Sequence, residues 1–261
     1  MGFRPVEFSH NSKFNSAASL DFLEVYNEFV ANQIIDTRSQ PKHKAFAPSS
    51  IRCDRLSWFR LRGVQPDKPN EADTVLQFSA DIGTACHRII QTNLRKMLQD
   101  DWIDVSEYLK TIDMPSTYAV EIDQTSGETL IALDSPPVRF ACDGIIRWNG
   151  ELYLLEIKSV DYNSWNSLTT YKPQHKDQVV CYSGLLKLNK VLFVYIDRWY
   201  GDIKCYEEKI PEYLQTAMFD KMIELTKLAE AGIAPEGLPK NDSWCSSGMC
   251  PYFKKCKEYG R

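Results

Sequence analysis

Long apolar segments are missing from this chain of 261 residues. It has no run of about 18 apolar residues, the length that a membrane-spanning helix needs. Its first residues, MGFRPVEFSHNSKFNS, also lack the apolar segment of a secretory signal. We therefore expect no membrane partner and a cytoplasmic location.

An excess of positive charge is missing as well. The chain carries 31 Lys and Arg against 35 Asp and Glu, which gives a net charge of −4. This balance excludes a protein coated in positive charge for non-specific nucleic-acid binding, but it leaves room for a local basic groove. Internal repeats and low-complexity tracts are also absent from the sequence. The composition is that of an ordinary globular protein.

Apolar residues change their spacing along the chain. Helical spacing predicts helices over about 21–36, 51–62 and 79–100, with a polar loop over 64–74. Strand-like runs follow from about residue 117, then a helix over 173–188, two more strands and a helix over about 212–231. This order favours an α/β fold with a mixed β-sheet flanked by helices.

One stretch of this sheet, DGIIRWNGELYLLEIKSV, places charged residues among apolar ones. Asn149-Gly150 within it is a strong signal for a hairpin with a two-residue type I′ turn. In that hairpin Asp143 lies opposite Glu156, with Cβ atoms about 4.5–5.5 Å apart. Lys158 shares their face, because side chains alternate along a strand.

Two opposed carboxylates destabilise a sheet unless a cation lies between them. A divalent metal meets this need, and a neighbouring ammonium can orient water or stabilise charge on a phosphate. The pattern therefore favours metal-assisted phosphodiester hydrolysis. The alternative is a solvated ion-pair patch; Ile145 and Leu154 on the same face argue instead for burial.

The arrangement resembles a known family. Asp143 followed by Glu156-Ile157-Lys158 matches the D…(D/E)-x-K core of the PD-(D/E)XK nuclease superfamily. His87 in an upstream helix, and Gln178 and Tyr182 in a downstream one, are similar to further motifs of its RecB-like branch. The resemblance implies a restriction-endonuclease-like sheet.

It also implies residue roles. The metal ligands it implies, for one or two Mn²⁺ or Mg²⁺ ions, are His87, Asp143, Glu156 and the Ile157 carbonyl. An imidazole ligand tilts the choice toward Mn²⁺. The resemblance makes Lys158 the residue that positions or activates the attacking water, with Gln178 and Tyr182 as support.

Cysteines are concentrated at the C-terminal end. Cys245, Cys250 and Cys256 fall within 12 residues, which suits a 4Fe-4S cluster or, less well, a structural zinc. The segment around Cys53 resembles the leading segment of iron–sulfur exonucleases of the RecB-like branch, including CRISPR-associated, AddB-type and phage relatives. That resemblance implies Cys53 as the fourth ligand, although those families usually have a shorter first gap in the tail.

The other four cysteines fall within helix and strand patterns, and we expect them to be buried thiols. They are Cys86, Cys142, Cys181 and Cys205.

Basic and aromatic residues cluster next to Cys53. Guanidinium groups contact phosphates and aromatic rings stack on unpaired bases, so this cluster is a candidate for DNA binding. Its members are Arg52, Arg55, Trp58, Arg60 and Arg62. The alternative is that Trp58 packs beneath the cysteine cluster.

These observations combine into one hypothesis. The chain would be a DNA exonuclease acting on single-stranded ends, with 5′ ends favoured by resemblance. We expect a flexible N-terminus over 1–18 and one domain over 19–261: a helical cap (19–100), a catalytic core (115–210), and a helix with the iron–sulfur clasp (211–261). Separate helicase, recombination or CRISPR-adaptation proteins would be its partners.

Two other classes of protein stay open. One is a DNA-binding or adaptor subunit of a recombination or CRISPR-adaptation complex that has the cluster but little or no cleavage. The other is a redox or metal-storage protein in which the cysteines are the function.

Overall fold

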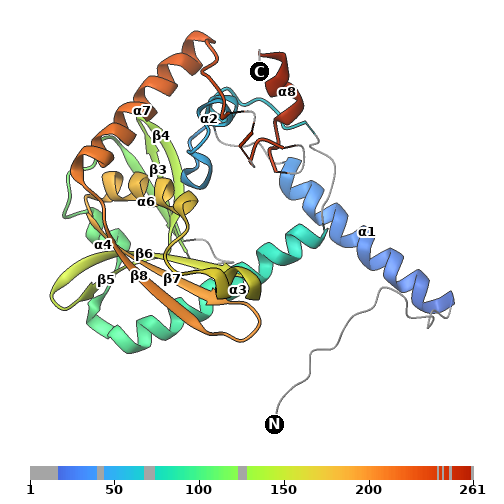
Figure 1. Ribbon diagram of the computed structural model, residues 1–261, viewed down its shortest axis with the longest axis horizontal. Helices are drawn as coiled ribbons and strands as arrows, with labels where there is room; N and C mark the ends of the chain where they lie inside the picture. The colour runs from blue at the N-terminus through green and yellow to red at the C-terminus, as the bar shows by residue number, and fades with distance from the viewer. Residues whose placement is uncertain are drawn as a thin grey trace. The chain divides into compact units, whose positions relative to one another are not determined.

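The computed structural model describes residues 17–39, 44–67, 74–122, 128–239, 241–242, 244–246 and 249–259. The flexible N-terminus predicted over 1–18 lies almost entirely outside these residues. The chain divides into two compact units, Met1–Gln40 with Pro69–Phe78, and Pro41–Lys68 with Ser79–Arg261. In the first unit the main described element is the helix α1 (Ala17–Ser39), which contains the helix predicted there (Figure 1).

The larger unit contains a five-stranded sheet with the order β1-β5-β6-β7-β8. Neighbouring strands are antiparallel except for β6 and β7, which are parallel. Its strands are β1 (Trp102–Ile103), β5 (Gly144–Trp148), β6 (Glu151–Val160), β7 (Lys190–Asp197) and β8 (Ile203–Lys209). A second, antiparallel sheet is formed by β2 (Tyr118–Ile122), β3 (Thr129–Asp134) and β4 (Pro137–Cys142). The predicted mixed sheet is confirmed.

Helices pack on both faces of the five-stranded sheet. On one face α3 (Thr74–Leu98) packs Ile90 against Leu155 and Ile157. On the other face lies the main core, to which α6 (Pro173–Leu186) and α7 (Glu212–Ala231) contribute (Figure 1). β6 is therefore buried on both faces, which explains its nearly continuous apolar sequence.

Shorter helices complete the unit. They are η1 (Pro48–Ser50), α2 (Asp54–Leu61), η2 (Gln99–Asp101), α4 (Val105–Leu109), α5 (Tyr162–Ser167) and α8 (Phe253–Glu258). Gly63 follows α2 with φ +65°, a left-handed conformation that is common for glycine just after the end of a helix. α3 begins at Thr74 rather than at the predicted residue 79. No helix among the described residues is long and apolar enough to cross a membrane.

The β5–β6 hairpin forms in the predicted register. Trp148 pairs with Glu151 and Gly144 with Leu155, at the two ends of the ladder. Asn149 (φ +50°) and Gly150 (φ +79°) both have positive φ, as a type I′ turn requires. Continuing the ladder by one residue places Asp143 opposite Glu156.

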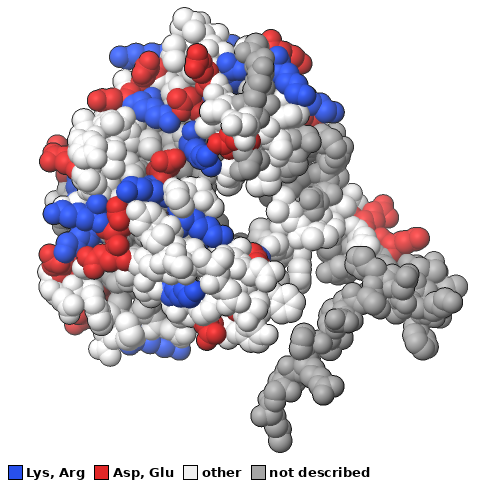
Figure 2. Space-filling model, viewed as in Figure 1, with Lys and Arg blue, Asp and Glu red and all other residues white. Residues whose placement is uncertain are grey.

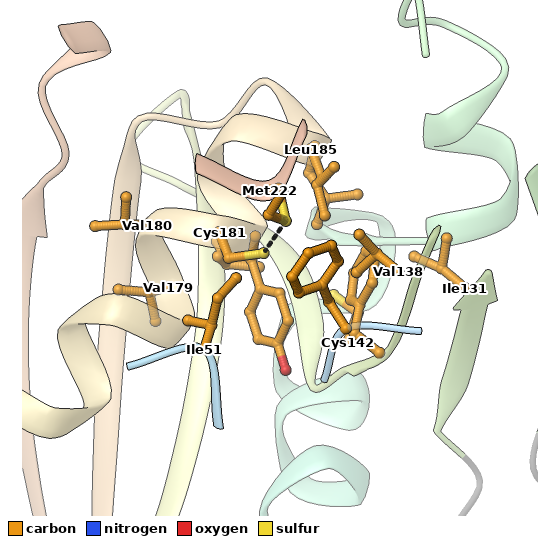
Figure 3. Packing of buried hydrophobic residues seen from close by; sticks show 14 of the residues in the cluster. Ile51, Ile131, Val138, Cys142, Val179, Val180, Cys181, Leu185 and Met222 are labelled. Carbon is orange, nitrogen blue, oxygen red and sulfur yellow. Dashed lines mark hydrogen bonds between the residues drawn. The ribbon is translucent and has the colours of Figure 1, made fainter. Parts of the chain in front are cut away.

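The main core contains two of the predicted buried thiols. Cys142 is 2% exposed and Cys181 is 1% exposed, and Cys181 Sγ lies 3.8 Å from Met222 Sδ (Figure 3). The prediction is wrong for Cys205, which is exposed on β8. β8 is the edge strand of its sheet, and its side chains alternate between exposed and half-buried. Cys86 on α3 is half-buried.

Candidate active site

Asp143 is fixed from three directions at the entry to β5. Its carboxylate accepts a hydrogen bond from the Ile157 backbone N–H (2.6 Å) and lies 3.1 Å from His87 Nδ1. The Gln91 side chain donates to its backbone carbonyl (2.8 Å). The buried Asp143 side chain is therefore held in one position by these contacts.

A second carboxylate, Glu128, approaches the same ring nitrogen of His87 as Asp143 does. Its Oε1 is 3.6 Å from His87 Nδ1. One ligand atom from each of His87, Glu128 and Asp143 lies within 4.8 Å of the others. Two carboxylates and an imidazole are ligands for a divalent ion such as Mn²⁺. These residues therefore form a candidate metal site.

The charge on His87 reflects these neighbours. Burial lowers its pKa, but the hydrogen bonds to Asp143 and Glu128 outweigh burial and raise the pKa to about 9. The apoprotein at neutral pH therefore holds a proton between the two carboxylates. A divalent cation would displace this proton on binding.

Glu156 and Lys158 form the other half of the site on β6. The Glu156 side chain is 1% exposed, and its Oε1 forms an ion pair with Lys158 Nζ. Burial raises the pKa of Glu156 to about 7, Lys158 opposes this rise, and Asp143 adds to it. The Lys158 side chain is 22% exposed, so the ammonium reaches the surface of the site.

The compact ligand group differs from the predicted metal shell. Glu128 belongs to it and Glu156 does not, while the Ile157 carbonyl stays a prediction. Thr129 pairs with Cys142 in the β3–β4 ladder, so extending that register by one residue puts Glu128 opposite Asp143. The register of this hairpin brings Glu128 to the site, and the sequence carries no strong turn signal from which that register could have been predicted. Glu121, the acidic residue of the β2 segment, is exposed.

The predicted support residues lie together on α6. The Gln178 amide donates to the Tyr182 hydroxyl (2.8 Å). Tyr182 is 4% exposed and stacks on Phe140 with ring centroids 4.9 Å apart. Tyr182 thus holds Gln178 in place from inside the core and does not itself reach the surface of the site.

A cavity of about 430 Å³ opens beside Lys158. Lys158, His175 and Gln178 line one part of it, and Arg52 and Arg60 line another. Three of the clasp cysteines predicted from the sequence also line it, and they are Cys53, Cys245 and Cys250. Three basic side chains, Lys158, Arg52 and Arg60, thus line one cavity next to the site. On the face shown in Figure 2, acidic and basic side chains of the described residues are interspersed.

Three members of the predicted DNA-binding cluster have a structural role. Trp58 is 2% exposed and its ring packs edge-on against Phe59 and Tyr259, so it cannot stack on a base as predicted. Arg55 is 6% exposed and donates to the carbonyl of Pro235, so it does not reach a phosphate. The Arg62 guanidinium lies over the Trp58 ring and donates to the Ala229 carbonyl (2.9 Å).

The other two members have partners but stay near the cavity. Arg52 forms an ion pair with Asp242 (2.6 Å), and Arg60 donates to the Ser50 hydroxyl. Both line the cavity beside Lys158. They remain candidates for contact with a ligand there.

None of the four clasp cysteines, all of which the structure describes, forms a disulfide. Burial raises the pKa of Cys250, and Cys53, Cys256 and Cys245 each raise it further. Arg55 Nη1 lies 3.8 Å from Cys256 Sγ. Segments at opposite ends of the larger unit's sequence therefore meet here.

No protein-family model matches the chain, and no curated protein sequence matches it. Among solved structures, the chain is similar to SSO0001 (15% identity, 86% of this chain and 93% of that chain covered, TM-score 0.43). It is also similar to LHK-Exo in complex with dAMP (15% identity, 79% and 93% covered, TM-score 0.38). A further structure of LHK-Exo, an alkaline exonuclease from Laribacter hongkongensis, gives 13% identity, coverage of 76% and 93%, and a TM-score of 0.37. At these values the likenesses say nothing about activity, which must be inferred from the site's own geometry.

Proposed function

We propose that the protein is a metal-dependent nuclease of the PD-(D/E)XK superfamily that hydrolyses phosphodiester bonds in DNA. One observation carries the proposal: a compact, half-buried group of His87, Glu128 and Asp143 lies beside a Glu156–Lys158 ion pair on the adjacent strand. Buried carboxylates need compensating positive charge, and a divalent cation would supply it at Asp143 and Glu128 in place of the proton on His87. The donor set fits a divalent ion of the Mn²⁺ or Mg²⁺ type.

The protein's own residues set up the reaction. The backbone N–H of Ile157 and the Gln91 amide hold Asp143 in its ligating position. Glu156 holds the Lys158 ammonium at the mouth of the site, where it can orient a water molecule toward a phosphorus atom or neutralise a phosphate oxygen. When bound, the cation supplies Lewis-acid polarisation of the phosphate.

The finer assignment is an exonuclease acting on single-stranded ends, with 5′ ends favoured. Its support is the resemblance of the sequence motifs to the RecB-like branch. The gathering of Lys158, Arg52 and Arg60 around one cavity supports it further, since a strand end needs a confined basic site rather than a broad basic surface. Separate helicase, recombination or CRISPR-adaptation proteins belong to the same proposal.

We include an iron–sulfur clasp in the proposal. Sulfur ligands of a single tetrahedral zinc lie about 3.8 Å apart, given Zn–S bonds of about 2.3 Å. Among the described residues, the clasp cysteines do not form a group that compact. The support for a larger cluster such as 4Fe-4S is the resemblance of the sequence, together with the position of Cys53, Cys245 and Cys250 in the lining of one cavity.

Cleavage of a 5′-labelled single-stranded oligonucleotide tests the nuclease. Protein purified without oxygen is assayed with Mn²⁺, with Mg²⁺ and with EDTA. Lys158→Ala should lose at least about 100-fold of the Mn²⁺-dependent rate, because it removes the ammonium at the reacting phosphate. Lys190→Ala is the matched control. Lys190 also forms an ion pair with a glutamate of β6, but that glutamate, Glu151, lies at the other end of the strand from Lys158.

The outcomes separate the function classes. Shortening that requires metal and Lys158 supports the nuclease, and the product lengths report polarity. Equal inertness of wild type and Lys158→Ala on single strands and duplex ends, combined with oligonucleotide binding, would instead favour the DNA-binding subunit.

A further inference from the structure

His175 is a buried imidazole beside the site to which the sequence motifs assign no role. It lies in the first turn of α6, one turn before Gln178. Its side chain lines the same cavity as Lys158 and Gln178. A strand end that enters this cavity would therefore come close to both His175 and Lys158.

A chain of hydrogen bonds fixes which ring nitrogen of His175 carries a proton. The Lys172 backbone N–H donates to the Tyr195 hydroxyl oxygen (2.9 Å). His175 Nδ1 lies 2.7 Å from the same oxygen. Among the described residues, Nδ1 is the acceptor within reach of the Tyr195 hydroxyl proton, so the hydroxyl donates to Nδ1. Nδ1 is therefore an acceptor, and in the neutral ring the proton sits on Nε2.

The surroundings keep this ring neutral. Burial lowers the pKa of His175 to about 3, and the ammonium groups of Lys158 and Lys172 lower it further. Within the part of the chain that the structure describes, Nε2–H has no acceptor, and Nε2 is not sealed from solvent. The protein thus holds a neutral donor of fixed tautomer in the wall of a basic cavity.

We propose that His175 is a phosphate-positioning residue that donates Nε2–H to a non-bridging oxygen of a DNA phosphate next to Lys158. The inference rests on the proposed function and deepens it by naming a further contact of the strand. A neutral donor gives the phosphate a direction, while Lys158, Arg52 and Arg60 supply the charge. The competing explanation is that His175 serves only as the acceptor for Tyr195.

Two substitutions separate these roles. In His175→Gln the side-chain amide nitrogen reaches the position of Nε2, so a donor to the cavity is kept and the acceptor for Tyr195 is lost. In His175→Asn the amide oxygen takes the position of Nδ1, so the Tyr195 contact is kept and the donor to the cavity is lost. His175→Ala removes both.

The primary measurement is the affinity for a 5′-fluorescein-labelled single-stranded oligonucleotide, by anisotropy with Ca²⁺ in place of Mn²⁺, so that binding is read without cleavage. A hydrogen bond to a charged phosphate contributes about ten-fold or more in affinity. We therefore expect His175→Asn and His175→Ala to bind about ten-fold more weakly than wild type, and His175→Gln to bind within about three-fold. Thermal unfolding should show the reverse order, with Asn closer to wild type than Gln.

The inference would be overturned if affinity followed thermal stability, so that His175→Asn bound nearly as well as wild type and His175→Gln bound as weakly as His175→Ala. His175 would then be only a structural partner of Tyr195. Equal affinity of all four proteins would overturn it as well. Cleavage of the same oligonucleotide with Mn²⁺ is scored separately. If the wild-type protein binds the oligonucleotide but does not cleave it, the proposed nuclease activity is wrong, while the affinities still decide the role of His175. If the wild-type protein neither binds nor cleaves it, the proposed function and the role of His175 are both wrong.

Discussion

At the scale of single residues, two different basic side chains neutralise the carboxylates of the site. The Lys158 ammonium lies against Glu156, whose side chain is almost fully buried. Asp143 and Glu128 face His87 instead. Because the ammonium is already paired with Glu156, a cation at the other two carboxylates does not have to displace it. Metal binding and the ordering of Lys158 can then be tested separately.

Glu128→Gln should weaken Mn²⁺ binding while leaving the fold intact. The substitution keeps the shape of the side chain but removes one of two negative charges around the ion, so we expect about ten-fold or greater loss of affinity. Isothermal titration calorimetry measures it directly. Glu121→Gln, on the same β2–β3 hairpin but exposed, is the matched control and should not change the affinity. If the two variants had the same affinity for Mn²⁺, Glu128 would not be a metal ligand.

His175 should make the protein less stable in mild acid. Its folded pKa of about 3 lies below its ordinary value of 6.5, so between these pH values the unfolded chain binds a proton that the folded chain does not. Stability from this group is complete above pH 6.5 and falls as pH drops toward 3, by at most about 1.4 kcal/mol per pH unit.

Urea unfolding of wild type and His175→Gln at pH 7.5 and pH 5 measures this effect. The variant should lose less stability than wild type between the two pH values. Lys158, Lys172 and Tyr195, the groups that face His175, are present in both proteins, and so is His87, whose raised pKa acts in the opposite direction. An equal loss in both proteins would mean that His175 is not held neutral in the fold.

At the scale of elements, two glycines of one hairpin have different reasons to be glycine. A Cβ on Gly144 would lie 2.6 Å from a ring atom of Trp102, which belongs to β1. A Cβ on Gly150 would meet nothing within 4 Å, so its restriction is only the positive φ of the turn. Gly150→Ala should therefore destabilise the protein by about 1 kcal/mol without changing metal binding.

Gly144→Ala should do more, because Asp143 is the preceding residue. The clash must be relieved by moving either the ring of Trp102 or the start of β5, at a cost of about 1–3 kcal/mol. A shift of β5 moves Asp143 out of reach of His87, so we expect about ten-fold weaker Mn²⁺ binding as well. Urea unfolding and calorimetry on both alanine variants check this pair. Unchanged Mn²⁺ affinity in Gly144→Ala would show that the ring gives way and the strand does not.

The hairpin also shows what could be read from the sequence and why. Its register follows from a two-residue turn, so Asp143 and Lys158 could be placed on one face without knowledge of the rest of the molecule. Glu128 depends on the register of a second hairpin, which has no such turn signal at Ser135-Pro136. His175 depends on a contact with Tyr195, a partner 20 residues away on another element.

Burial was harder to predict than pairing. Trp58 lies among arginines in the sequence, but its side chain packs against the tail residue Tyr259 and donates to the Leu228 carbonyl, and both partners are distant in sequence. Cys205 has a strand pattern like that of Cys142, yet it lies on an edge strand and is exposed. Local sequence carries the period of a strand but not its position in the sheet.

At the scale of the larger unit, the proposed clasp would join the start of α2 to the C-terminal segment around α8. Cys53 and Cys245 are separated by roughly 190 residues, so a shared cluster would close a long loop and restrict the unfolded chain. The cluster-binding energy then becomes folding energy. Residues of both segments line the cavity beside Lys158, so a clasp between these segments would also shape the access to the site.

Cys53→Ser should therefore lose bound iron, the visible absorbance of the cluster and about 4 kcal/mol or more of stability. Cys205→Ser is the matched control, since Cys205 is an exposed thiol on β8 far from the other cysteines in sequence. Both variants are purified without oxygen, and iron content, absorbance and urea unfolding are compared with wild type. Because Asp143, Glu128 and His87 come from other segments, Mn²⁺ binding should survive in whatever fraction of Cys53→Ser remains folded. Iron content equal to that of wild type in Cys53→Ser would rule out Cys53 as a ligand, and wild-type protein that carries zinc in place of iron would replace the cluster with a structural zinc site.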